Sequence, residues 1–165
     1  MAVKAKSKHV MTFTLTSDRE FVMARAFDAP RALVFEAWTR PEHLKHWYGC
    51  SSHTLRTCEI DLRVGGAYRF VMRAPDGVDH TMTGVYREIA PPERLVYTER
   101  YVTAGFESND AVVTVLFTEQ DGRTTLTATV RHQSQADRDG HLGAGVEHGA
   151  AEVFERLAEH LTTMI

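Results

Sequence analysis

The sequence has few cysteines and no long apolar run, and these absences exclude several classes of protein. Its 165 residues include two cysteines, Cys50 and Cys58, without CxxC spacing, which predicts reduced thiols rather than a disulfide framework. No apolar stretch approaches the ~18 residues of a membrane span, and the first residues lack the apolar core of a signal peptide. We therefore expect a cytoplasmic protein with no membrane insertion.

The sequence also lacks a strong charge and any familiar catalytic or cofactor motif. Its net charge is −3, from 19 basic and 22 acidic residues, and no basic block is present, so we expect no nucleic-acid partner. Nine histidines are many, but His43 and His46 have no acidic or cysteine ligand at fixed spacing, so we expect no metal. There is no Ser-His-Asp set, phosphate loop, dinucleotide fingerprint or paired-carboxylate motif, and we expect no cofactor.

What the sequence does contain is a long amphipathic segment near its end. Between Leu142 and Met164 the apolar and small residues recur at helical spacing and fall on one arc, which predicts a single helix. The arc comprises Leu142, Val146, Gly149, Ala150, Val153, Leu157, Leu161 and Met164. Such a helix must bury its apolar arc, and the strand-like middle of the chain predicts an antiparallel sheet as its partner.

The rest of the chain reads as one α+β domain. Residues 1–9 are polar and without period, which predicts a flexible N-terminus followed by a single domain over 10–165. Two short helices are expected after Pro30 and Pro41, with Asp28 as the candidate cap of the first. A polar connection is expected over 134–140. Strands are expected around residues 12–16, 21–27, 54–62, 68–73, 80–86, 95–101, 113–117 and 126–130.

Several motifs give the chain a resemblance to a known superfamily. They are RAFDAPR with LVFEAWT (25–31 and 33–39), PEHL with Trp47 (41–44), DLRVGGAYRF (61–70), GVYREI with PPERLV (84–89 and 91–96), and GVEHG (145–149). Together they resemble the SRPBCC superfamily (START-like, birch-pollen-allergen-like), and within it the branch named after the activator of the heat-shock protein 90 ATPase. The resemblance spans nearly the whole chain.

This resemblance implies a helix-grip fold and says less about activity. The fold is a curved antiparallel sheet of six to seven strands wrapped around a long C-terminal helix, with two short helices closing one end of an internal cavity. Superfamily members bind lipids, hormones or polyketides, or act as cyclases and dehydratases, and no catalytic residue set transfers to this chain. Many members of the branch have an aromatic residue where this chain has Ala150, a departure that would enlarge or reshape the cavity.

The leading hypothesis is a protein that holds a hydrophobic or amphipathic small molecule between sheet and helix. Aromatic side chains with polar tips, apolar strand residues and helix residues are the candidate cavity lining. The candidates are Trp38, Trp47, Tyr48, Phe70, Met72, His80, Met82, Tyr86, Tyr97, Phe117, Val146, Glu147 and Ala150. Trp38, Trp47 and Tyr48 fit a place in the hydrophobic core as well as they fit a cavity lining. His80 also fits an ordinary strand end, and Glu147 also fits a solvated helix flank.

Two other functions stay open at this point. One is a cyclase or hydratase that uses the same cavity, with His80 or Glu147 moving protons. The other is a protein that binds a chaperone through its outer surface, which is disfavoured because the sequence lacks the additional N-terminal domain of the co-chaperones. A homodimer formed through a sheet or helix edge also stays open, since no residue specifies it.

Overall fold

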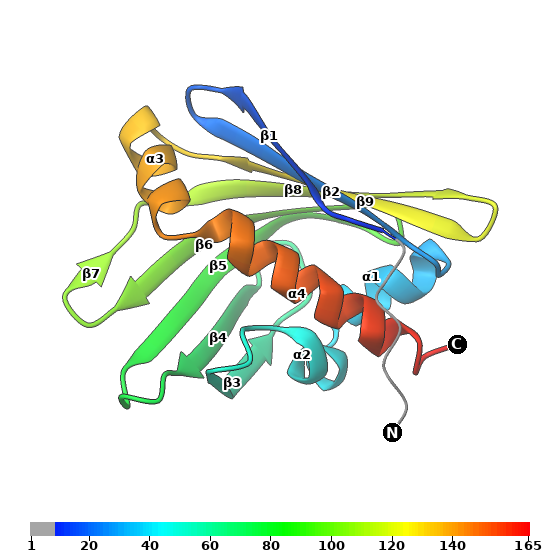
Figure 1. The fold of residues 1–165 in the computed structure, drawn as a ribbon, viewed down its shortest axis with the longest axis horizontal. Coiled ribbons are helices and arrows are strands. Elements are labelled where there is room, and N and C mark those ends of the chain that lie inside the picture. The colour runs from blue at the N-terminus through cyan, green and yellow to red at the C-terminus, as the bar shows by residue number, and fades with distance from the viewer. Residues whose placement is uncertain (1–8) are drawn as a thin grey trace.

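The computed structural model describes residues 9–165 as one antiparallel sheet and four helices (Figure 1). The strands are β1 (Thr12–Ser17), β2 (Glu20–Phe27), β3 (Thr54–Ile60), β4 (Ala67–Arg73), β5 (Asp79–Ala90), β6 (Arg94–Thr103), β7 (Phe106–Glu107), β8 (Ala111–Gln120) and β9 (Arg123–Arg131). The helices are α1 (Arg31–Thr39), α2 (Pro41–Trp47), α3 (Gln135–Gly143) and α4 (Val146–Leu161). The predicted α+β helix-grip fold is confirmed, with nine strands instead of six to seven.

The strand order in the sheet is β1-β2-β9-β8-β6-β5-β4-β3, with the two-residue β7 beside β6. Helix α4 crosses one face of this sheet, and α1 and α2 lie near its C-terminal end (Figure 1). Because side chains alternate along strands, each strand sends every second residue toward α4. Pairs such as Phe21 opposite Val130 and Leu126 opposite Phe117 are almost completely buried there, so the core lies between the sheet and the helices.

The flexible segment expected over residues 1–9 falls, except for its last residue, outside the described residues. His9 contacts Asp28, with 3.0 Å between Nε2 and Oδ1. Within residues 9–165, no helix is both long enough and apolar enough to cross a membrane.

The two short helices are confirmed, but only some of the residues expected to start them do so. Pro41 occupies the first position of α2, where its missing N–H costs no hydrogen bond. The expected cap Asp28 does not cap α1, because the helix begins after Pro30 and the Asp28 carboxylate instead accepts from Arg123 at 3.1 Å. Trp47 fixes α2 against α1 by donating from Nε1 to the Ala37 carbonyl at 2.9 Å.

The prediction of one helix from Leu142 to Met164 is wrong at its N-terminal end. The segment breaks at Gly145, which has φ of +86°, a left-handed conformation that glycine adopts without strain. The polar connection expected over 134–140 is helix α3, which begins where the Ser134 hydroxyl accepts from the Asp137 backbone N–H. Helix α4 therefore starts at Val146 and ends at Leu161.

A pair of histidines, the buried His132 and the half-buried His141, joins α3 to the sheet. His132 Nδ1 lies 3.0 Å from the Arg19 carbonyl oxygen, so it carries the proton and leaves Nε2 to accept from His141 Nδ1 at 2.9 Å. Both rings pack on Phe21 with centroids 5.3 Å away. Burial, followed by the neighbouring His132, lowers the pKa of His141 to about 4, and burial also lowers the pKa of His132. Both imidazoles are therefore neutral in the folded protein near pH 7.

We expect this histidine pair to make folding sensitive to acid. In the unfolded chain a histidine takes up its proton near pH 6.5, whereas folded His141 resists it down to about pH 4, so the stabilisation is present above pH 6.5 and is lost as pH falls through this window. A loss of about 2 kcal/mol follows from about 1.4 kcal/mol per pKa unit, reduced for partial solvent access. Urea unfolding at pH 7.5 and pH 4.5 measures it.

The variant His141→Leu should flatten this pH dependence, and the exposed helix residue His148, changed to glutamine, is the matched control. An unchanged pH dependence in His141→Leu would show that other groups cause the acid sensitivity.

Candidate functional site

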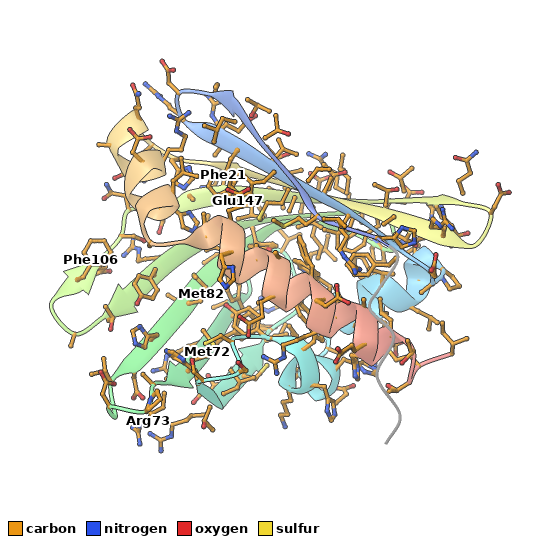
Figure 2. All side chains as sticks on the ribbon, viewed as in Figure 1. Phe21, Met72, Arg73, Met82, Phe106 and Glu147 are labelled. Atoms are coloured by element: carbon orange, nitrogen blue, oxygen red, sulfur yellow. The ribbon has the colours of Figure 1, made fainter. Side chains whose placement is uncertain are left out.

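Strands β4, β5 and β6 place most of the predicted site residues on one face. Phe70 lies opposite Met82, Met72 opposite His80, and Tyr86 opposite Tyr97, so these six side chains point to the same side of the sheet. Figure 2 labels Met72 and Met82 on these strands, in the part of the view below α4. Phe70 and Tyr97, which are 27 positions apart in the sequence, therefore lie on one surface.

Aromatic rings from four different elements form a continuous network on this face. Trp38 of α1 lies 6.4 Å from Phe117 and 5.1 Å from Trp47, between ring centroids, and Trp47 in turn lies 6.1 Å from Tyr48. From Tyr48 the network continues through Phe70 at 4.7 Å. The structure thus brings together the early aromatics and the strand aromatics that were predicted separately.

The network continues into three tyrosines on adjacent strands. Tyr68 lies 5.1 Å from Phe70, 5.6 Å from Tyr86 and 5.5 Å from Tyr97. The Tyr68 hydroxyl donates to the Thr98 carbonyl at 2.6 Å, so its polar tip is satisfied within the protein. Trp47, Phe117 and Tyr86 are buried, whereas Trp38, Tyr48 and Tyr97 retain part of their accessible surface.

One carboxylate lies among these rings, on Glu99 of β6. Tyr97 pairs with Val113 and Glu99 with Ala111, so the two side chains are on the same face. Burial raises the pKa of Glu99 to about 7. Burial raises the pKa of Tyr48, Tyr68 and Tyr97, and the negative charge of Glu99 is the second cause for each.

Glu99 has no charged or hydrogen-bonding partner among residues 9–165. It is nevertheless only half-buried by accessible surface, although desolvation is strong enough to shift its pKa. Glu99 therefore combines a desolvated carboxyl group with residual solvent accessibility.

The predicted polar anchor His80 forms a pair with Tyr101 of β6. Its Nδ1 lies 2.5 Å from the Tyr101 hydroxyl oxygen, and its ring packs edge-on against His53 with centroids 5.3 Å apart. His53 Nδ1 in turn lies 2.8 Å from both Cys50 Sγ and Ser52 Oγ. His80 is therefore tied to the loop that follows α2 rather than standing alone on the aromatic face.

Helix α4 contributes the opposite wall of the site. Val146 and Ala150 are half-buried, and the fully buried Phe154 and Leu157 follow one and two turns later. Glu147, in contrast, is exposed in the first turn, so its side chain lies in solvent. Helix α4 also holds the loop after α2, since Arg156 donates to the Gly49 carbonyl at 2.6 Å.

A buried arginine joins α4 to the other half of the sheet. Arg25 is 3% exposed, and its guanidinium donates to Glu155 at 3.0 Å and lies 4.7 Å from the centroid of Phe27. Burial lowers the pKa of Arg25, and the Glu155 carboxylate opposes that shift. This pair orients the helix over the sheet, and its positive charge is already matched.

A separate depression lies at the outer edge of the sheet, with a volume of about 440 Å³. It is lined by Ser52, Thr54, Arg56, Arg73, Ala74 and Pro75, none of which was predicted as a site residue. Arg73 is held there by Asp79 at 2.9 Å. Among residues 9–165, no three His, Cys, Asp or Glu side chains gather in a way that would hold a metal ion.

Sequence reasoning missed Glu99, Tyr68 and Tyr101. The signal was present in the alternation of β6, where Leu95, Tyr97, Glu99 and Tyr101 share one face. A charged residue in register with apolar and aromatic neighbours on a strand is the pattern that would have identified Glu99.

The fold and its aromatic face define the helix-grip class of α+β proteins. Residues 28–162 match the family described as "Activator of Hsp90 ATPase homolog 1-like protein", and the chain belongs to that family. No functionally curated protein matches the sequence.

Solved structures with the same fold come from several bacteria. A Rhodobacter sphaeroides protein is 23% identical with a TM-score of 0.87, covering 93% of this chain and 99% of that one. A Mycobacterium smegmatis protein is 21% identical with a TM-score of 0.82, covering 91% and 95%. A Nitrosomonas europaea protein is 23% identical with a TM-score of 0.79, covering 92% and 99%. At these identities the likeness concerns the fold alone.

Proposed function

We propose that this protein binds a hydrophobic or amphipathic small molecule between α4 and the aromatic face of β4, β5 and β6. The proposal rests on Tyr48, Tyr97 and Glu99. Their polar groups are desolvated, as the raised pKa values indicate, and yet their side chains keep part of their solvent-accessible surface. Sites for small molecules are mostly apolar with a few polar groups that fix orientation, and this surface has that composition.

The apolar part of the ligand would supply most of the affinity. Each Å² of apolar surface removed from water contributes about 25 cal/mol, and the half-buried Trp38, Tyr48, Met72 and Met82 offer such surface. The polar tips of Tyr97 and Glu99 would then select the orientation of the ligand.

Native mass spectrometry of freshly purified protein, followed by extraction and identification of any bound compound, tests the proposal. A stoichiometric apolar or amphipathic molecule is the expected result. Protein that carries no ligand, and that binds no member of a library of apolar compounds, would contradict it.

Filling the space beside α4 should weaken ligand binding. The half-buried Ala150 lies on the inner side of α4, and the neighbouring Ala151 is exposed. We expect Ala150→Phe to reduce the affinity for an extracted or library ligand by tenfold or more, because the new ring occupies ligand space, while Ala151→Phe leaves the affinity unchanged. Isothermal titration calorimetry measures both, and equal effects of the two variants would place the ligand elsewhere.

A further inference from the structure

We propose that the ligand carries a basic amine and that its cationic nitrogen binds beside Glu99 within the cage formed by Tyr48, Tyr68 and Tyr97. This inference rests on the proposed function and specifies the chemical class of its ligand: an amphipathic amine, with an apolar body against the aromatic face and a protonated head at the carboxylate.

The first argument is the missing counter-charge. A carboxylate placed among apolar side chains is costly unless it is paired or hydrogen-bonded, and within residues 9–165 Glu99 has neither kind of partner. Its side chain is half-buried on the aromatic face beside Tyr97, where desolvation raises its pKa to about 7. A cation bound at this place would remove the cost, since an opposite charge within a few Å favours the ionised form.

The neighbouring cations of the protein are already engaged elsewhere. Arg100 directly follows Glu99 on β6, so its side chain points to the opposite face of the sheet. There it donates to Asp110 at 2.7 Å and to Glu107 at 2.8 Å. Arg25 is held by Glu155. Neither arginine pairs with Glu99, and we infer that the cation of a bound molecule takes this place.

The second argument is the chemistry of the surrounding rings. Tyr97 lies on the same face of β6 as Glu99, and the Tyr68 ring packs 5.5 Å from the Tyr97 ring. The Tyr68 hydroxyl donates to the carbonyl of Thr98, the residue before Glu99, and the charge of Glu99 also contributes to the raised pKa of Tyr48. Tyrosine rings attract cations through the negative potential of their faces, most strongly in a desolvated site. A carboxylate inside an aromatic cage is suited to an ammonium group, and it repels an anionic head such as that of a fatty acid.

Three ligands with the same ten-carbon chain test the inference: decylamine, decanol and decanoate, each below its micelle concentration. Titration calorimetry at pH 7.5 should give an affinity for decylamine at least tenfold higher than for decanol, and the weakest binding for decanoate. In Glu99→Gln the advantage of the amine over decanol, with both ligands measured on the same variant, should fall below threefold. The exposed residue Glu59 of β3, changed to glutamine, is the control for general attraction to a negative protein.

The outcomes separate this inference from the proposed function. If decanol binds but the amine has no advantage over it, or keeps its advantage in Glu99→Gln, the inference is wrong and the binding function stands. If none of the three ligands binds and the purified protein carries no other small molecule, the binding function itself is contradicted. Far-UV circular dichroism and thermal unfolding of Glu99→Gln, compared with the parent protein, show that the variant is folded.

Discussion

Replacing Trp47 by alanine should lower the free energy of unfolding by about 3–5 kcal/mol, among the largest effects expected for a single core substitution. Trp47 is 1% exposed and packs on Trp38 at 5.1 Å between ring centroids. Its removal leaves a large cavity between α1 and α2 and breaks the hydrogen bond to Ala37. Urea denaturation at pH 7.5 measures the change.

The variant Trp47→Phe separates the two contributions. It retains much of the apolar area but leaves the buried Ala37 carbonyl without its donor, at a cost of about 1–3 kcal/mol. A loss below 1 kcal/mol for Trp47→Ala would show that this tryptophan is not part of the core and that its place in the aromatic network is incidental.

Gly84→Ala should be comparably severe, for a different reason. A Cβ atom at Gly84 of β5 would lie 1.8 Å from the Thr98 carbonyl oxygen and 2.8 Å from the Tyr68 hydroxyl. Since β5 and β6 must separate to admit it, we expect a loss of about 3 kcal/mol in the free energy of unfolding. The strained contact lies one residue from Glu99, so binding of decanol should weaken as well.

Gly140 in α3 is the matched control, because a Cβ there meets no other atom within 4 Å. Gly140→Ala should stabilise the helix by about 0.5–1 kcal/mol. Thermal unfolding of both variants measures the contrast, and a Gly84→Ala protein as stable as the parent would mean that β5 and β6 are not as closely spaced as described.

The order of elements was predictable because most of them carry strong local signals. Strand alternation around Phe70 and Phe117, together with the prolines that start α1 and α2, gave the strands and helices between residues 12 and 131 nearly in place. The end of the chain was harder. The helical period continues from Leu142 into α4, and the sequence pattern does not show that Gly145 adopts a left-handed conformation that breaks it.

The candidate site was predicted in its apolar part and missed in its charged part. Trp38, Tyr48, Phe70, Tyr86 and Tyr97 do meet on one face. Whether a given ring is buried or partly accessible depends on how far α4 stands from the sheet, which no local pattern specifies.

The charged group of the site could be predicted only with knowledge of the sheet register. Glu147 was a candidate because it lies at the edge of the helical arc, with a solvated flank as the alternative, and it is exposed. The carboxylate on the aromatic face is Glu99. Identification of Glu99 required the pairing of β6 with β8, which sets the face on which each residue lies.

The most direct test of the central claim is methyl NMR of the methionines during titration with decanol. Met72 and Met82 lie on the aromatic face, whereas Met164 follows α4 near the end of the chain. We predict ligand-dependent shifts and intermolecular contacts at Met72 and Met82, with Met164 unchanged. Shifts at Met164 without any at Met72 or Met82 would contradict binding between α4 and the sheet.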